Sequence, residues 1–236
     1  MKFSSEKLEA IRSDLGSKSA QEILSWALRT FGDRVVLATS FGLEGVALID
    51  MASKLGMPYK VLTLDTGRLP EETYEVMDRI REKYKISVEV YFPDAAKVEA
   101  LVRSKGLYSF RQSVENRKEC CGIRKVEPLQ RALKHRDAWV TGLRREQSVT
   151  RTDLSMFEID DAHGGMLKIN PLIDWSGKKV WEYVRKNKVP YNKLHDQGYP
   201  SVGCQPCTRA VKPGEDIRSG RWWWERPEHK ECGIHR

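Results

Sequence analysis

The chain has 236 residues, with 41 Lys and Arg against 33 Asp and Glu, so its formal net charge at pH 7 is +8. This length is enough for one hydrophobic core and is also compatible with two small domains. The positive excess predicts an anionic partner, either a charged small molecule or a nucleic acid, unless it only forms a solvated surface. Residues 1–7 are mostly polar, with no apolar run of signal-peptide or membrane-span length. We therefore expect a cytoplasmic protein with no membrane partner and few structural disulfides.

The first third of the chain alternates helical and extended patterns. Apolar residues at helical spacing predict helices over residues 5–15 and 19–31, and the apolar run over 34–39 predicts a buried strand. A turn over 40–45 then leads into a predicted helix over 46–55.

The following segments repeat this unit. The sequence predicts a strand over 59–64, a turn over 65–70, a helix over 71–84, and further strands over 88–91 and 138–141 with helices between them. Strands that alternate with helices predict an α/β fold with a mostly parallel, doubly wound sheet. Ligands of such sheets bind outside the carboxyl ends of the strands, where both turns fall.

The first of these turns reads S-F-G-L-E-G and holds the candidate phosphate contacts Ser40 and Gly42. Small residues before a helix let backbone N–H groups approach an anion closely. The alternative is an ordinary helix cap. The turn matches neither G-x-x-x-x-G-K-[ST] nor G-x-G-x-x-G, so the sequence supports neither a P-loop nor a dinucleotide-binding fold.

The five cysteines are the strongest chemical signal. They form an adjacent pair, Cys120 and Cys121, a C-x-x-C pair, Cys204 and Cys207, and a single residue, Cys232. Two close pairs predict ligation of a metal or an iron–sulfur cluster, with inert buried thiols as the alternative. Zinc also accepts four thiolates. Consecutive side chains diverge, however, so an adjacent pair suits a larger cluster better, which favours iron–sulfur. The fifth cysteine suggests a nucleophile.

Basic residues concentrate in two later segments. Arg144, Arg145 and Arg151 occupy a polar segment without a clear period, which predicts a loop. Their guanidiniums are suited to a doubly anionic ligand, and the alternative is a solvated loop. The end of the chain carries further cations around Cys232, namely Arg218, Arg221, Lys230, His235 and Arg236. We expect the tryptophans at 222–224 to pack this tail onto the domain.

Seven motifs in order resemble the iron–sulfur adenylyl-sulfate (APS) reductases, a branch of the assimilatory sulfonucleotide reductases. They are T-S-F-G-L-E-G at 39–45, L-D-T-G-R-L-P-E-E-T-Y at 64–74, C-C-G-I-R-K-V-E-P-L at 120–129, T-G-L-R-R-E-Q-S at 141–148, N-P-L-I-D-W at 170–175, G-Y-P-S-V-G-C-Q-P-C-T-R at 198–209 and K-E-C-G-I-H at 230–235. The resemblance runs from about residue 35 to the end of the sequence.

The resemblance implies an adenine-nucleotide α-hydrolase-like fold and reduction of APS to sulfite and AMP in assimilatory sulfate reduction. It implies that Cys232 attacks the substrate sulfur to form an S-sulfocysteine, which thioredoxin or a similar thiol reductant then cleaves. The four paired cysteines fall on the positions that hold a [4Fe-4S] cluster. Lys125 falls on a lysine between cluster and substrate, and Arg218, Arg221 and His235 fall on phosphosulfate contacts. Gly67 and Arg68, in the second turn, become candidate substrate contacts.

This interpretation places a catalytic domain over residues 1–215 and a tail with the nucleophile over 216–236. The paired cysteines favour APS over its 3′-phosphorylated form, PAPS, but the S-F-G turn departs from the S-G-A-E form of many APS enzymes, so activity on PAPS stays an alternative. An ATP pyrophosphatase or RNA-thiolating enzyme should carry S-G-G-x-D-S after the first strand, and the S-F-G-L-E-G turn does not fit this pattern. A zinc-stabilised nucleic-acid-binding module would give Cys232 no role. We therefore expect no nucleic-acid partner, and the oligomeric state, a homo-oligomer included, stays open.

Overall fold

The computed structural model describes residues 2–147, 154–231 and 233–234. The chain forms two compact units, and each unit is assembled from three separate segments of the sequence. Unit 1 comprises residues 1–63, 75–89 and 133–192, and unit 2 comprises residues 64–74, 90–132 and 193–236. The predicted division at residue 215 stays a prediction, and the described residues on both sides of it belong to unit 2.

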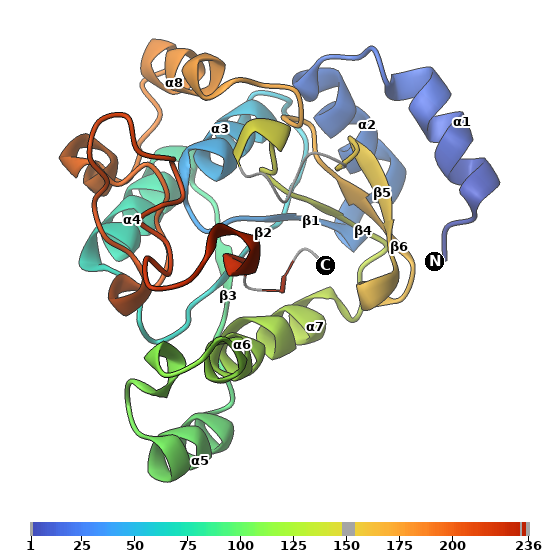
Figure 1. Ribbon diagram of the computed structural model, residues 1–236. Coiled ribbons are helices and arrows are strands. Elements are labelled where there is room, and N and C mark those ends of the chain that lie inside the picture. The colour runs from blue at the N-terminus through green and yellow to red at the C-terminus, as the bar shows by residue number, and fades with distance from the viewer. Residues whose placement is uncertain (1, 148–153, 232, 235–236) are drawn as a thin grey trace. The chain divides into compact units, whose positions relative to one another are not determined.

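A mostly parallel sheet of six strands carries the fold (Figure 1). The strands are β1 (Val35–Ala38), β2 (Val61–Leu64), β3 (Val88–Tyr91), β4 (Ala138–Val140), β5 (Phe157–Asp160) and β6 (Met166–Ile169). Their order is β3-β2-β1-β4-β6-β5. Strand β1 runs parallel to β2 and β4, and β4 runs parallel to β6, whereas β5 is antiparallel to β6. The sequence prediction of a mostly parallel sheet is confirmed, and the β5–β6 edge is an addition to it.

The helices follow the predicted alternation. They are α1 (Ser5–Leu15), α2 (Ala20–Phe31), α3 (Leu43–Ser53), α4 (Glu71–Tyr84), α5 (Ala95–Lys105), α6 (Val114–Cys121), α7 (Glu127–Leu133) and α8 (Gly177–Lys186). Side chains of Ser19 and Glu22 form a capping box that satisfies free N–H groups at the start of α2. Helix α3 begins three residues earlier than predicted, because it starts directly from the turn after β1.

The core of unit 1 lies between the sheet and its helices. Residues from β1, α2 and α3 are almost completely buried there, including Ile23, Val35 and Ile49. The turn into α3 requires glycine at position 45, because a Cβ atom there would lie 2.0 Å from the Thr39 hydroxyl oxygen. This close approach explains a glycine of the first motif and fixes α3 against the end of β1.

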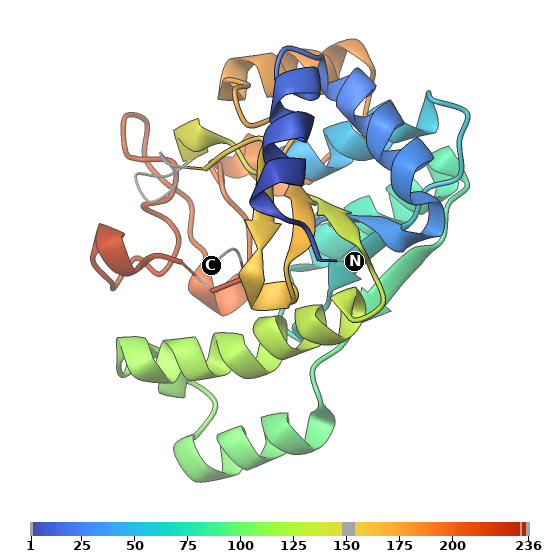
Figure 2. The ribbon, with the colours of Figure 1, turned by 90° about the vertical axis from the view of Figure 1, so that its right-hand side faces the viewer.

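In unit 2, α6 and α7 are joined by a π-helical turn over Gly122–Val126. Figure 2 shows α6, this turn and α7 continuing as one helical rod. The side chain of Ser113 caps α6 by accepting a hydrogen bond from the Asn116 N–H at 3.1 Å. The rod therefore starts at the cap residue Ser113. Arg124 and Lys125 lie in the π turn, three and four residues after Cys121.

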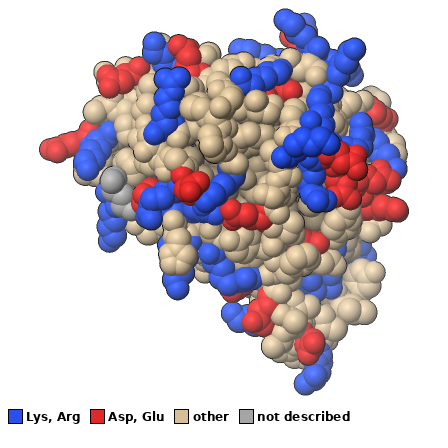
Figure 3. Space-filling model, turned by 180° about the vertical axis from the view of Figure 1, so that it is seen from behind, with Lys and Arg blue, Asp and Glu red and all other residues tan. Residues whose placement is uncertain are grey.

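The surface mixes both signs of charge. On the face shown in Figure 3, Lys and Arg side chains are interspersed with Asp and Glu. Some surface ion pairs join residues close in the sequence, such as Arg81 with Asp78 at 2.7 Å. Among the residues that the structure describes, no helix is long and apolar enough to cross a membrane.

Candidate functional site

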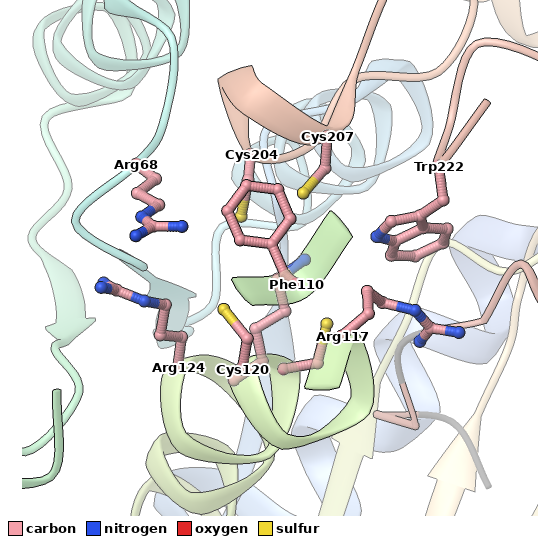
Figure 4. Close-up of a pocket in the computed structure, with 10 residues that line it drawn as sticks. Arg68, Phe110, Arg117, Cys120, Arg124, Cys204, Cys207 and Trp222 are labelled. Atoms are coloured by element: carbon pink, nitrogen blue, oxygen red, sulfur yellow. The ribbon is translucent and has the colours of Figure 1, made fainter. Parts of the chain in front are cut away.

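Four of the five cysteines line one pocket in unit 2. Cys120 and Cys121 come from the last turn of α6, and Cys204 and Cys207 come from the short 3-10 turn Gln205–Cys207 and the residue before it. All four are buried free thiols. Figure 4 shows the sulfur atoms of the two segments turned toward the space between them. The two pairs that the sequence singles out are therefore brought together.

Backbone and hydroxyl contacts fix the C-x-x-C turn. The N–H of Gln205 donates to the carbonyl of Arg68 at 2.8 Å, and the N–H of Cys207 donates to the carbonyl of Cys204 at 2.9 Å. The hydroxyl of Thr66 lies 3.2 Å from the sulfur of Cys204, within hydrogen-bond distance. The loop after β2 and the C-x-x-C turn are thus tied together inside unit 2.

Four cations line the same pocket, namely Arg68, Arg117, Arg124 and Lys125. Arg68 donates to the carbonyl of Leu107 at 2.8 Å, and its guanidinium lies 5.0 Å from the Phe110 ring centre. Arg124 is buried and donates to the carbonyl of Thr66 at 2.6 Å. These neutral partners leave the positive charge of both groups available to the nearby sulfurs.

The cysteine thiols respond differently to this setting. Burial raises the pKa of Cys204, but the charge of Lys125, the Thr66 hydroxyl and the charges of Arg221 and Arg124 outweigh burial and lower it. Burial, followed by the negative charge of Cys204, raises the pKa of Cys207 to about 12. Burial also raises the pKa of Cys120. The protein alone therefore favours a thiolate at one position of the pocket and disfavours several at once.

Two buried donors in the pocket lack an acceptor. Within the described ranges, the indole N–H of Trp222 and the Nε of Arg124 have no hydrogen-bond partner. Trp222 is only 1 % exposed, and Figure 4 shows its indole facing the thiols. Buried donors without a partner are costly, so they indicate an acceptor that belongs in the pocket. In the described part of the chain, no three His, Cys, Asp or Glu side chains are grouped so that they could hold a single metal ion.

The tail arginines also belong to unit 2. Arg218 donates to the carbonyl of Lys230 at 2.7 Å and lies 3.6 Å from the carboxylate of Glu231. Arg221 is 7 % exposed, donates to Ser201 and Val202, and stacks 4.7 Å from the Trp222 ring centre.

The glycine directly before the C-x-x-C pair has a steric reason. A Cβ atom at Gly203 would lie 2.2 Å from a guanidinium nitrogen of Arg221, so glycine leaves room for this arginine in its observed position. Of the predicted packing tryptophans, Trp222 is buried, whereas Trp223 is 38 % exposed.

The second predicted turn contributes to unit 2 as well. Gly67 has φ of +68°, and its N–H donates to the carboxylate of Asp65 at 2.8 Å. A Cβ atom at this position would lie 3.5 Å from Arg124, and the neighbouring Arg68 lines the cysteine pocket.

The remaining predicted residues lie in unit 1 or outside the described residues. Ser40 is exposed and Gly42 caps the N-terminus of α3. Arg144 is buried and donates to Glu44 at 2.8 Å and Glu146 at 2.9 Å, and Arg145 pairs with Asp174. The structure therefore holds both loop arginines against carboxylates. Arg151, Cys232 and His235 lie outside the described residues.

Sequence reasoning gives no site role to four residues that line the pocket, namely Phe110, Arg117, Arg124 and Trp222. Thr66, which contacts Cys204, and Arg124 fall inside quoted motifs, but nothing in the sequence distinguishes them from surface residues. For Trp222 the sequence predicts only that it packs the tail onto the domain. Arg117 is the largest omission, because it is 0 % exposed and forms a buried ion pair with Glu225 at 2.9 Å. An arginine three residues before a cysteine pair is the one signal that the sequence offers.

Comparisons with known proteins agree on one family. Residues 34–210 match the family model described as "Phosphoadenosine phosphosulfate reductase domain". The chain is 51% identical to "Adenosine 5'-phosphosulfate reductase" of Allochromatium vinosum over 92% of this chain and 84% of that protein. It is 46% identical to "5'-adenylylsulfate reductase 3, chloroplastic" of Arabidopsis thaliana, over 98% of this chain and 52% of that longer protein.

A solved structure gives the same answer for the fold. The phosphoadenylyl-sulfate (PAPS) reductase from Candida auris, crystallised as a phosphate complex, superposes with a TM-score of 0.76 at 31% sequence identity. The match covers 89% of this chain and 99% of the fungal chain.

Proposed function

The chain belongs to the phosphoadenosine phosphosulfate reductase domain family, and on this premise we propose that it reduces APS to sulfite and AMP with a thiol reductant. Its fold is the adenine-nucleotide α-hydrolase-like fold that the sequence predicts. The observation that carries the proposal is the pocket in which four thiols meet four cations. The names of the curated relatives in bacteria and plants support APS as the substrate and assimilatory sulfate reduction as the process.

We further propose that Cys120, Cys121, Cys204 and Cys207 hold a [4Fe-4S] cluster. Four buried thiols supply the ligand type that such clusters take, and metal binding removes their protons, which burial alone resists. The unpartnered donors of Trp222 and Arg124 suit the sulfur acceptors of a cluster. When bound, the cluster would supply fixed charge and structural support beside the substrate.

In the first half of the proposed reaction, the thiolate of Cys232 attacks the sulfur of APS. A sulfur–sulfur bond forms while the bond between sulfur and the bridging phosphate oxygen breaks, and the bridging oxygen leaves on AMP with the electron pair. The product on the protein is an S-sulfocysteine. AMP is a good leaving group, so this step needs no general acid.

In the second half, a thiolate of a dithiol reductant such as thioredoxin attacks the sulfur of Cys232. Sulfite leaves with the electron pair of the sulfur–sulfur bond, and a mixed disulfide forms. The second thiol of the reductant then attacks the reductant's sulfur in this mixed disulfide. Cys232 is released as a thiol, and the reductant is oxidised to a disulfide. This chemistry requires a reducing compartment, for which we propose the cytoplasm.

Cations lower the barrier of the first step, because a thiolate and a sulfate ester repel each other. We assign this role to Lys125 beside the cysteine pocket and to Arg218, Arg221 and His235 in the tail. The further proposed substrate contacts are Ser40, Gly42, Gly67, Arg68, Arg144, Arg145 and Arg151. Among these, Arg144 and Arg145 already pair with carboxylates, so we expect any role in binding to require exchange of those partners.

The substrate choice can be tested by direct competition. We expect a higher kcat/KM for APS than for PAPS, because the sequence offers no extra basic group for a 3′-phosphate. The likeness to the Candida auris protein, which is named a PAPS reductase, makes the PAPS reaction the second candidate. Equal or inverted preference in a mixture of both nucleotides would favour that candidate.

The central experiment follows sulfur through the protein. Incubation with APS and no reductant should add the mass of one SO₃ group to a peptide containing Cys232 and release an equal amount of AMP. Added thioredoxin should remove the adduct as sulfite. The variant Cys232→Ser should bind APS and keep its iron but form neither adduct nor product. Normal turnover by this variant, or an adduct on one of the paired cysteines, would contradict the mechanism.

A further inference from the structure

Arg117 joins the cysteine-bearing helix to the end of the chain. It lies on α6, three residues before Cys120, and its side chain has no exposed surface. A buried guanidinium needs partners for its five N–H donors and for its charge. These partners show what the residue does.

One side of the guanidinium binds the carboxylate of Glu225. The Nε atom donates at 3.0 Å and one terminal nitrogen donates at 2.9 Å, which is a two-pronged contact. Glu225 is itself buried, with 3 % of its side chain exposed. The pair therefore neutralises the charge of Arg117 but uses only two of its donors.

The other donors bind the backbone that leads to Cys232. Arg117 donates to the carbonyl of His229 at 2.5 Å and to the carbonyl of Glu231 at 2.6 Å. Two carbonyls held by one rigid fork define both the position and the direction of residues 229–231. Glu231 is the residue directly before the proposed nucleophile.

The same guanidinium also reaches the cysteine pocket. It lines this pocket together with Cys121 and lies 4.9 Å from the Trp222 ring centre. On the far side of position 232, Gly233 has φ of +86°, and a Cβ atom there would lie 3.8 Å from Val126 in the π turn. The described residues on both sides of position 232 thus lie against the helical rod that carries Cys120 and Cys121.

We propose that Arg117 is a positioning residue that holds the backbone before Cys232 against the cysteine-bearing helix, and so couples the nucleophile to the cluster site. This inference rests on the proposed function. An ion pair that served stability alone would need no contact with residues 229 and 231. Because attack requires the nucleophile within a few tenths of an ångström of its line of approach, backbone placement of this kind should affect the rate of sulfur transfer.

Two variants separate positioning from burial of charge. Arg117→Lys keeps the charge, but one ammonium cannot replace a fork that binds a carboxylate and two carbonyls. The double variant Arg117→Met with Glu225→Leu removes both charges together, so no buried charge is left without a partner. Arg124→Lys is the matched control, because Arg124 is a buried arginine of the same pocket whose described hydrogen bond goes to Thr66 instead of the tail.

The first measurement is backbone hydrogen exchange of peptides covering residues 226–236 in the resting holoprotein. Loss of the two carbonyl contacts should speed exchange in both Arg117 variants by about tenfold, and in Arg124→Lys it should leave exchange unchanged. Unchanged exchange in the double variant, with iron content retained, would overturn the proposal.

The second measurement is single-turnover formation of the Cys232 adduct from APS. We expect the rate to fall by about tenfold or more in the double variant and less in Arg117→Lys, while AMP affinity stays within about twofold of wild type. A purely structural role would instead give wild-type rates in the folded double variant, and this result would also overturn the proposal. Failure of the wild type to form any adduct would count against the proposed function, whereas a normal wild type with normal variants would count against Arg117 alone.

Discussion

Arginines of unit 1 and arginines of the cysteine pocket in unit 2 bind different kinds of partner. In unit 1, Arg34 pairs with Asp137, Arg136 with Glu89 and Arg144 with Glu44, so each positive charge meets a carboxylate. In the cysteine pocket of unit 2, the described hydrogen bonds of Arg68 and Arg124 go to neutral carbonyls. Arg117 with Glu225 is the buried exception.

This difference in partners distinguishes arginines that stabilise the fold from arginines that act on the pocket sulfurs. Paired charges cancel, so the arginines of unit 1 hold loops and helices together and create little field. Cations with neutral partners keep their field. Lys125 first, then the Thr66 hydroxyl, Arg221 and Arg124 lower the pKa of Cys204 against the effect of burial. Substitutions of the paired Arg34 or Arg136 in unit 1 should therefore change mainly the free energy of unfolding, and substitutions in the pocket should change mainly iron content and rate.

The largest effect should follow from loss of one pocket thiol. We expect Cys207→Ser to lose most of its iron and its brown absorbance, with activity falling by about 100-fold or more. Iron and sulfide analysis of anaerobically purified protein is the measurement. Cys232→Ser is the matched control, since it should keep the iron and lose only turnover. Stoichiometric zinc in active wild type would contradict the cluster proposal.

A buried carboxylate in unit 1 should give the largest change in stability. Asp50 is 2 % exposed and accepts hydrogen bonds from Lys54, Tyr84 and Tyr183 at 2.6 to 2.8 Å. Asp50→Ala removes the acceptor of both tyrosine hydroxyls and leaves Lys54 with neutral partners such as Asn187, so it should cost about 3 kcal/mol of unfolding free energy.

Urea denaturation measures this cost. The exposed Asp78, paired with Arg81, is the control, and Asp78→Ala should cost less than about 0.5 kcal/mol. We expect the folded Asp50→Ala protein to keep its iron. Loss of iron at unchanged stability would show that the separation between the units does not hold.

A smaller effect on rate should follow from removal of a tail cation. Arg221→Ala should cost about 2 kcal/mol of transition-state stabilisation, which is roughly a 30-fold loss of kcat/KM with APS. Arg209 is an exposed arginine of the same unit, and Arg209→Ala should change kcat/KM by less than about twofold. Near-normal values in both Arg218→Ala and Arg221→Ala would show that these arginines do not bind the substrate as proposed.

The smallest effect is a pH dependence in unit 1. The hydrogen bonds from Arg34 lower the pKa of Asp137 from 3.8 to about 2. A lowered pKa in the folded state means that the contribution is complete above the unfolded value and disappears as pH falls toward 2. We expect Asp137→Asn to cost about 1 kcal/mol at pH 7, and less as pH falls below 4. Urea midpoints from pH 7 to pH 3 measure it, and a constant difference across this range would exclude the ionised Asp137 carboxylate as the cause.

The sequence predicts much of the fold because its local signals agree with the global arrangement. The helices over Ser5–Leu15 and Glu71–Tyr84 and the strand over Val88–Tyr91 have the predicted bounds. The edge strand Phe157–Asp160 is missed, since four residues that pair only with β6 carry no local period. The π turn over Gly122–Val126 is missed for a similar reason, because its wider hydrogen-bond spacing leaves no pattern in the apolar residues.

The sequence predicts those site residues whose chemistry follows from their type and spacing. It does not predict residues whose role depends on partners far away in the sequence. Cysteine spacing alone brings Cys120, Cys121 and the C-x-x-C pair into one prediction. The sequence cannot give Arg117 its role, since its partner Glu225 lies 108 residues further along the chain. The sequence also cannot show that Arg144 donates to Glu44, because the two residues lie 100 positions apart in the chain.

The way the chain is divided has a consequence for how the protein is made. Unit 2 takes residues 64–74 and 90–132 from the first part of the chain and residues 193–236 from its last part. During synthesis, Cys120 and Cys121 therefore leave the ribosome well before Cys204 and Cys207 exist. The pocket can close only after the intervening segment 133–192 has been synthesised, so insertion of the proposed cluster would have to be a late event. For the same reason unit 2 cannot be excised as a continuous fragment, and exchange of this pocket between proteins would require three simultaneous grafts.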